Sequence, residues 1–459
     1  MQFVPSSSRM QSQPTITLAT LKRNLPVSWN TVHTFVSKRV HQGLTCCARP
    51  ASMTTTTTEE KRGVEHFNPL DQQHIVEKVK FYDKVNRIED VPHVEAAWDW
   101  FAGLGKPKLW VAPMVDQSEL AFRMLCKTYG ADAAYTPMLH ARLFNETLAY
   151  REEHFLTCPE EDRPLLAQFC ANDPDILLAA ARHVEPYVDG VDINLGCPQR
   201  IAKKGRYGAY LMDDIPLIES LVRTLAENLS VPVTVKIRRF PDIRDTIEYA
   251  ARLEKAGASL VAVHGRLREE KRSIASMACW ETIAAVKKSL HVPVLANGNL
   301  RNMFDVQHCL ELTGADGVMS AESLLEDPAM FSPKRLLPGG EYKPSEGPHL
   351  LLEYCDWAEK FPPPYRMVRG HSFAMLGSWL SEFIDMREEL RTSVRDIPAL
   401  REFTGRLIQK IEATGRDHPI PAVSKRRLKA MEAEAAKEAA IQAQEEEEKA
   451  LAALDWSDA

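Results

Sequence analysis

Seven side chains suited to ligand binding or catalysis stand at the ends of short apolar runs in this 459-residue chain. They comprise three amides, a lysine, a histidine, a cysteine and a methionine: Met114, Gln168, Asn194, Cys197, Lys236, His264 and Asn297. Each alone has an ordinary structural explanation, such as a histidine capped within the core. If the runs are parallel strands, however, their carboxyl ends meet at one mouth. The coincidence therefore predicts a functional site there.

Lys236 is the most informative of the seven because it lies inside the apolar run Val-Thr-Val-Lys-Ile. An unpaired ammonium group in such a place is costly, so we expect it to meet an anion. Farther along, residues 296–299 (Ala-Asn-Gly-Asn) and 321–322 (Ala-Glu) occupy positions where parallel barrels bind phosphate. An Asn-Gly pair alone is more often a plain turn. Together these signals predict a ligand with a phosphate and a second electron-rich region.

Cys197 is the candidate for proton or covalent chemistry. Pro198 disfavours a helical conformation at the residue before it, so the thiol is expected in extended chain just beyond a strand end. A nucleophile and a proton donor are both conceivable, but no histidine and acid stand in a protease-like arrangement. A thiol with a pKa near about 8.5 is mostly protonated at neutral pH and can act as a general acid.

Eight apolar runs between residues 109 and 320 alternate with amphipathic stretches of helical periodicity, which predicts parallel β/α architecture. The runs are Leu109–Met114, Ala133–Thr136, Leu165–Cys170, Val191–Leu195, Val233–Ile237, Leu260–His264, Val294–Asn297 and Gly317–Ser320. We predict a (β/α)8 TIM barrel followed by a small all-helical domain with its own core. A doubly wound sheet is the alternative, but no early glycine fingerprint appears. The longest interval follows Cys197, so that loop is also a functional candidate.

Composition divides the chain into five parts. We expect the barrel over 109–337, a small helical domain over 338–430, and an acidic Ala/Glu-rich tail over 431–459. Residues 59–108 are expected to be a linker and pre-barrel segment. Residues 1–58 hold six Lys or Arg and no Asp or Glu, which is typical of a transit peptide for a mitochondrion or chloroplast. The alternative is a disordered tail on a protein of the cytoplasm or nucleus.

The formal net charge of -6 conceals regional differences. Residues 331–430 carry 17 Lys or Arg and 13 Asp or Glu, whereas the tail carries two and nine. A basic helical domain beside an acidic barrel is an arrangement that could bind RNA on its basic side. No apolar run is long enough for a membrane helix, and nine cysteines without CxxC spacing argue against a zinc site or a disulfide framework. We therefore expect no membrane or metal partner, and a monomer.

Several segments, in order along the chain, resemble the motif series of the tRNA-dihydrouridine synthases. They are Ala112–Met114, Asp192–Pro198, Val235–Arg238, Val263–Arg266, Ala296–Asn299 and Gly314–Met319. The stretch 197–205 and the Ala-Glu pair at 321–322 resemble most the eukaryotic class that acts on D-loop uridines 16 and 17. The resemblance implies an FMN-binding barrel, NADPH or NADH as reductant, and tRNA as substrate.

The resemblance also implies roles for individual residues. Cys197 would give a proton to C5 of uracil while hydride from N5 of FMN goes to C6. The implied cofactor-binding residues are Pro113, Met114, Val115, Gln168, Asn194, Lys236, His264, Asn297, Gly298, Asn299, Ala321 and Glu322. The implied tRNA contacts are Arg200, Lys203, Lys204, Arg206 and Arg266, although the first four are equally explained as a solvated basic loop.

Two departures from the family pattern stand close to these residues. Glu322 replaces the arginine usual near the phosphate, so backbone amides are the expected binders there, and Leu267 replaces a threonine. Two other functions remain open at this level: an FMN-dependent oxidoreductase of a free pyrimidine, and a catalytically idle tRNA-binding protein. The helical domain and the basic loop argue against the first, because a small substrate needs neither.

Overall fold

The computed structural model describes residues 84–270, 277–335 and 346–419. The expected transit segment 1–58 and the acidic tail 431–459 lie outside these residues, as do the first and last residues of the expected helical domain.

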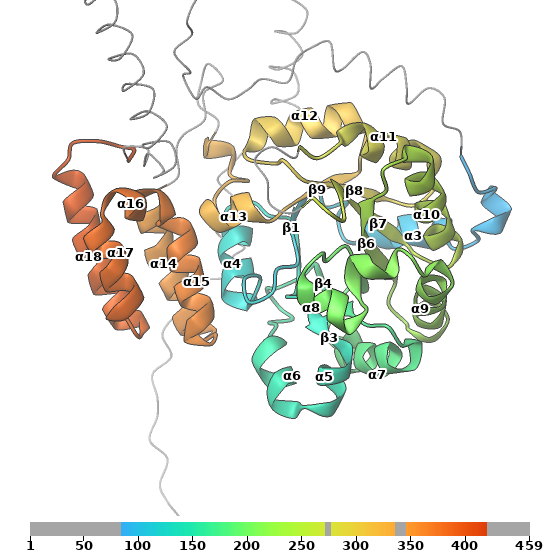
Figure 1. The fold of residues 1–459 in the computed structure, drawn as a ribbon, viewed down its shortest axis with the longest axis horizontal. Helices are drawn as coiled ribbons and strands as arrows, with labels where there is room; N and C mark the ends of the chain where they lie inside the picture. Colours follow the sequence, from blue (N-terminus) through green and yellow to red (C-terminus); the bar gives the residue numbers. More distant parts are fainter. Residues whose placement is uncertain (1–83, 271–276, 336–345, 420–459) are drawn as a thin grey trace, which may run out of the picture. The chain divides into compact units, whose positions relative to one another are not determined.

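Eight parallel strands close into a barrel (Figure 1), as predicted. They are β1 (Leu109–Val111), β2 (Ala133–Tyr135), β4 (Leu165–Cys170), β5 (Gly190–Leu195), β6 (Val233–Arg239), β7 (Leu260–Leu267), β8 (Val294–Asn297) and β9 (Gly317–Ser320). Pairing of β2 with both β1 and β4 completes the ring. Five strands, β1, β2, β5, β6 and β7, differ from the predicted bounds by one to three residues, and an additional short strand, β3 (Leu139–His140), pairs with β4.

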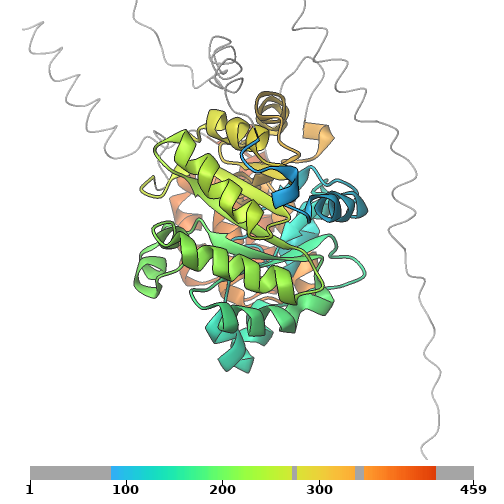
Figure 2. The same ribbon diagram turned by 90° about the vertical axis from the view of Figure 1, so that its right-hand side faces the viewer.

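Helices cover the outside of the barrel. They include α4 (Leu120–Thr128), α7 (Pro174–Val184), α9 (Ile215–Asn228), α10 (Ile243–Lys255), α11 (Trp280–Ser289) and α12 (Met303–Thr313). Several of these helices begin at a side-chain cap. Figure 2 views the side covered by α9 and α10. Asp173 and Asp214 accept hydrogen bonds from backbone N–H groups of the first turns of α7 and α9, which explains where these helices begin.

The amino-terminal end of the barrel is closed by aromatic side chains of α3 (Val94–Gly103), which belongs to the segment expected before the barrel. Phe101 is buried with the inward-facing residues of the strands, and Trp98 and Trp100 pack beside it. The indole N–H of Trp100 donates to the carbonyl oxygen of Asp189, immediately before β5. Since this end is filled, a ligand can reach the interior only at the carboxyl ends of the strands.

Two connections are longer than the others. The chain between β2 and β4 contains α5 (Ala141–Glu146) and α6 (Leu148–His154). The chain after Cys197, expected to be a functional loop, contains α8 (Arg200–Gly205) and a 3-10 turn at Gly208–Leu211 before α9 begins. The short helix α13 (Glu322–Glu326) follows β9 directly.

The carboxyl-terminal region is all helical, as predicted. Its helices are α14 (Gly347–Lys360), α15 (Tyr365–Met375), α16 (Gly377–Glu382), α17 (Ile384–Thr392) and α18 (Ile397–Glu412). Of five apolar residues whose helical spacing predicts a core here, Leu376, Trp379 and Leu380 are buried, and Phe373 and Phe383 are partly buried. The expectation of a separate core was wrong, because α14 packs against α4 and the apolar side chains of the two regions form one continuous cluster.

A buried polar cluster joins this helical region to the barrel. Glu119, just before α4, accepts hydrogen bonds from the hydroxyl of Tyr354 at 2.7 Å and from the ring Nε2 of His371 at 2.9 Å. The His371 ring stacks on Phe122 with centroids 4.4 Å apart. Burial alone would raise the pKa of Glu119, but the charge of His371 and these hydrogen bonds lower it below the usual value. The carboxylate therefore remains charged and binds two helices of the carboxyl-terminal region.

We expect Glu119→Ala to lower the free energy of unfolding by about 3 kcal/mol, because it leaves two buried polar partners unsatisfied. Arg142→Ala is the matched control, since Arg142 forms only an exposed ion pair with Glu146 and should change stability by less than about 0.5 kcal/mol. Chemical denaturation of both variants measures the difference. Equal stabilities for the two variants would contradict a structural role for the buried cluster.

Candidate active site

The carboxyl half of the barrel interior is polar, and strand register brings its side chains into layers. Paired residues in neighbouring strands point to the same side of the sheet, so register decides which of them meet. The layers contain Gln168, Asp192 and Thr234, then Asn194 and Lys236, and then Arg238, His264 and Asn297.

A chain of hydrogen bonds runs from the deepest of these layers to Cys197. Asp192 accepts from the hydroxyl of Thr234 at 2.6 Å and from the side-chain amide of Gln168 at 2.8 Å. The Gln168 carbonyl oxygen accepts from the Asn194 amide at 2.7 Å, and Asn194 Oδ1 accepts from the backbone N–H of Cys197 at 2.9 Å. Burial raises the pKa of Asp192 to about 6. Gln168 is fully buried, and its side-chain carbonyl oxygen holds the Asn194 amide in place.

Lys236 projects into the interior, as its place in an apolar run predicts. Its ammonium group donates to Asn297 Oδ1 at 2.9 Å, and the Asn297 amide donates to the carbonyl oxygen of Met319 at 2.6 Å. Burial and the positive charge of Arg238 lower the pKa of Lys236 to about 8, while Asp192 partly opposes this change. An anionic ligand would stabilise the ammonium form.

His264 is neutral at physiological pH. Burial, together with the charges of Lys236, Arg238 and Arg266, lowers its pKa well below the usual value. Arg266 lies 3.2 Å from His264 Nε2, and since a guanidinium can only donate, Nε2 accepts and the proton resides on Nδ1. Arg266 also donates to Asn299 Oδ1 at 2.7 Å. It thus lies on the side of the expected phosphate loop, although it was expected to contact tRNA.

The turn after β8 has the backbone shape expected for close approach of a ligand. Gly298 has φ of +114° and Asn299 has φ of +60°. A Cβ added at Gly298 would lie 2.7 Å from the Cβ of Ala278 and 3.1 Å from the ring of His264. Only glycine therefore fits here, and successive backbone N–H groups in such a turn can bind an anion.

Three interior residues were missed in the sequence: Asp192, Thr234 and Arg238. Each lies two positions from a predicted site residue in the same strand, so strand alternation could have identified them. Arg238 donates to the carbonyl oxygen of Gly196 at 2.7 Å and to that of Leu267 at 2.7 Å. Burial and the charge of Arg266 lower its pKa to about 10.

Cys197 lies half-buried beyond the end of β5, as Pro198 predicts. Its carbonyl oxygen accepts from the backbone N–H of Ala209 at 3.1 Å. Gly208, with φ of +65°, approaches so closely that an added Cβ would lie 2.8 Å from this carbonyl oxygen. Burial raises the pKa of the thiol above its usual value, although the charges of Arg238 and Lys236 oppose this. The thiol is therefore held protonated at neutral pH.

The remaining predicted residues lie around the same mouth or beside it. Pro113 and Met114 are half-buried and Val115 is exposed in the loop after β1, where the backbone N–H of Met114 donates to the hydroxyl of Ser118. Ala321 precedes α13, and Glu322 is exposed at its first residue. The four basic residues that follow Cys197 are all exposed and form no ion pair within the described part of the chain: Arg200, Lys203, Lys204 and Arg206.

The described residues form neither a metal-binding cluster nor a membrane-spanning helix. Within 84–270, 277–335 and 346–419, no group of three or more His, Cys, Asp or Glu side chains could hold a metal ion. Over the same ranges, no helix has both the length and the apolar character needed to span a membrane.

Comparison with known families identifies the barrel. The family model described as "Dihydrouridine synthase (Dus)" matches residues 110–360. The chain belongs to the dihydrouridine synthase family. The match begins in β1 and ends with α14, so it includes every strand of the synthase barrel and all the predicted site residues, whereas α15 to α18 lie beyond it.

Named relatives of the synthase include members of two positional classes. A Rattus norvegicus protein named as a tRNA-dihydrouridine(16/17) synthase-like protein is 46% identical over 302 residues, which are 65% of this chain and 67% of the rat protein. A tRNA-dihydrouridine(16/17) synthase of Schizosaccharomyces pombe is 45% identical over 301 residues, covering 64% and 75% of the two chains. A human tRNA-dihydrouridine(20a/20b) synthase-like protein is 36% identical over 283 residues, covering 61% and 84%.

We expect Gly298→Ala to lower the free energy of unfolding by about 2 kcal/mol, because the new methyl group meets Ala278 and alanine rarely adopts this φ. Gly405→Ala in α18 is the matched control: no atom lies within 4 Å of its added Cβ, and it should stabilise the helix by about 0.5 to 1 kcal/mol. Urea unfolding distinguishes the two. A Gly298→Ala protein as stable as the parent would show that the turn tolerates a side chain.

Proposed function

We propose that this chain is an FMN-containing, NAD(P)H-dependent tRNA-dihydrouridine synthase that acts on uridine 16, uridine 17 or both. The observation that carries the proposal is the placement of a protonated Cys197 thiol at the mouth of an interior lined by cations. The printed names of the rat and fission yeast relatives support the positional class. Mapping of dihydrouridine in tRNA from cells with and without the protein tests both the reaction and the target position.

The donor set fits FMN on electrostatic grounds. Lys236, Arg238 and Arg266 bring three cations to the mouth, and burial, together with the charge of a neighbouring arginine, lowers the pKa values of the first two. A phosphate would lie at the Gly298 turn beside Arg266, which supplies the cation that Glu322 does not. Lys236 and Asn297 would hold the electron-rich part of the ring system. Bound FMN, reduced by NADPH or NADH, supplies the hydride that adds to C6 of the uracil.

Cys197 completes the reduction by giving its thiol proton to C5, so that one hydride and one proton saturate the double bond. The charges of Arg238 and Lys236 stabilise the thiolate that remains, because both lower the pKa of Cys197. Water or buffer then returns the proton. A base in folded tRNA must leave its stack to reach this mouth, which requires RNA contacts beyond the barrel.

Cys197→Ala should reduce dihydrouridine formation at least 100-fold, while reduction of bound FMN by NADPH continues, because only the proton donor is lost. Cys158→Ala, in a loop away from the interior, is the control and should retain normal turnover. Stopped-flow absorbance separates the two half-reactions. Wild-type turnover by Cys197→Ala would exclude the proton-donor role.

The pH dependence of the parental enzyme gives a second prediction. Since burial raises the pKa of the Cys197 thiol, parental activity should fall only when the pH exceeds the usual thiol range.

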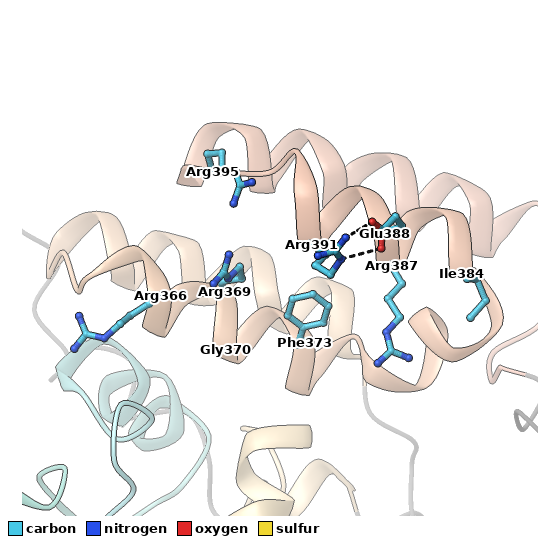
Figure 3. Close-up of a pocket in the computed structure, with 9 residues that line it drawn as sticks. All are labelled: Arg366, Arg369, Gly370, Phe373, Ile384, Arg387, Glu388, Arg391 and Arg395. Carbon is cyan, nitrogen blue, oxygen red and sulfur yellow. Dashed lines mark hydrogen bonds and ion pairs between the residues drawn. The ribbon is translucent and has the colours of Figure 1, made fainter. Parts of the chain in front are cut away.

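We further propose that the phosphate backbone of tRNA binds in an arginine-lined groove of the helical region (Figure 3). The groove has a volume of about 940 Å³ and lies between α15 and α17. Its lining residues are Arg366, Arg369, Gly370, Phe373, Ile384, Arg387, Glu388, Arg391 and Arg395. Five guanidinium groups with one carboxylate form a strongly positive surface, and the exposed Ile384 offers an apolar contact.

These arginines differ in their availability. Arg366 is bound to Asp116 of the β1 loop and to Glu153 of α6, so it joins the helical region to the barrel. Arg391 forms an ion pair with Glu388. Arg369 and Arg387 form no ion pair within the described residues, which makes them the best candidates for contact with phosphate.

The double variant Arg369→Ala/Arg387→Ala should raise the KM for tRNA with little change in kcat, and reduce the dependence of log Kd on log salt by about two, because two phosphate contacts are lost. Arg182→Ala, an exposed arginine on α7, shows the effect of losing one positive charge outside the groove. Filter binding at several salt concentrations measures the slope. Parental affinity and slope in the double variant would place the RNA elsewhere.

A further inference from the structure

Asp192 is a buried, charged group that the proposed chemistry does not use. It lies in β5 with no exposure to solvent, and its two carboxylate oxygens accept from Thr234 on one side and Gln168 on the other. A buried carboxylate is expensive, and its pKa of about 6 leaves it mostly ionised at neutral pH. Its position suggests a function in the site above it.

The carboxylate of Asp192 determines the orientation of the Gln168 amide, which in turn determines the orientation of the Asn194 amide. An ionised carboxylate can only accept hydrogen bonds, so Gln168 must turn its NH₂ group toward Asp192. The carbonyl oxygen of Gln168 then faces Asn194, which must present its own NH₂ group at 2.7 Å. Consequently Asn194 Oδ1 points toward the loop, where it accepts from the backbone N–H groups of Gly196 at 3.2 Å and Cys197 at 2.9 Å.

This series of hydrogen bonds has a fixed donor–acceptor direction at both ends. Asp192 is an acceptor at one end, and the backbone N–H groups of residues 196 and 197 are donors at the other. Two amides placed between them satisfy every group in only one orientation. If the carboxylate became able to donate, Gln168 and Asn194 could both turn over, and the NH₂ group of Asn194 would then face the N–H of Cys197 with no acceptor between them.

The other contacts of the Cys197 turn do not replace this one. Arg238 holds the carbonyl oxygen of Gly196, and Ala209 holds the carbonyl oxygen of Cys197. Those contacts fix the carbonyl side of the turn, whereas Asn194 alone binds its N–H side among the described residues. The backbone N–H of Gln199 also contacts the thiol itself, so the direction of the thiol depends on that contact and on the Asn194 contact, whose polarity is set in the barrel interior.

We propose that Asp192 is a positioning residue that aims the Cys197 thiol through Gln168 and Asn194. This inference rests on the proposed function of Cys197 as the proton donor. It assigns the buried carboxylate to the second half-reaction, the step in which uracil is reduced, and not to reduction of the flavin.

Two substitutions interrupt this series of hydrogen bonds at different points. Asp192→Asn replaces the acceptor with a group of the same shape that can donate, and Gln168→Met removes the first amide while leaving the carboxylate in place. We expect both to slow reoxidation of reduced enzyme by tRNA at least tenfold. For Asp192→Asn, the KM for tRNA and the rate of flavin reduction by NADPH should change less than twofold. Tyr249→Phe controls for loss of a buried polar atom, because its hydroxyl has no hydrogen-bond partner among the residues that the structure describes.

A double-mutant comparison shows whether Asp192 acts through the thiol. In the Cys197→Ala background, Asp192→Asn and Gln168→Met should cause no further loss in the residual rate, since the group that they position is absent. Multiplicative losses in that background, or a parental reoxidation rate in both single variants, would overturn the inference. Equal slowing of flavin reduction would also overturn it and assign Asp192 to the cofactor. A Cys197→Ala protein with normal turnover would instead refute the proposed function itself.

Discussion

The register of parallel strands β5 to β8 is the constraint on which the site depends. It places Asn194 beside Lys236, and Arg238, His264 and Asn297 in one layer, although these residues are scattered over about a hundred positions of the chain. Because side chains alternate along each strand, a shift of one residue would turn this set toward the surrounding helices. Closure of the amino-terminal end by α3 leaves the layer accessible from one side only, so binding and chemistry share one mouth.

The interior balances two kinds of buried polar group. Lys236, Arg238 and Arg266 create a positive region that suits an anionic ligand, and burial together with these charges lowers the pKa of His264 and keeps it neutral. Below them, Asp192 and two amides form a network with fixed polarity that ends at the Cys197 turn. The same side chains that would be costly in an apolar core thus organise the site, since each has a partner of suitable polarity.

The helical region shares an apolar core with the barrel, but its surface carries an arginine-lined groove. Its apolar side chains join the outer core of the barrel, and the cluster around Glu119 fixes α14 and α15 against α4. Arg366 reaches the loop after β1, which carries the predicted flavin contacts. The arginines that remain available line a groove between α15 and α17. One set of helices therefore combines a firm attachment with a surface suited to RNA.

Local sequence patterns determined the barrel, the helical region and much of the site. Apolar runs located all eight barrel strands. Pro198 and the apolar neighbours of Lys236 indicated a thiol just beyond a strand end and a buried cation. The sequence could not reveal that Asp192 meets Gln168, that Glu119 meets His371 across 252 positions, or that Arg266 faces the Gly298 turn. Nor did it show that the two regions share one core. Periodicity depends on near neighbours, whereas these contacts arise from strand register and helix packing, which only the closed tertiary structure establishes.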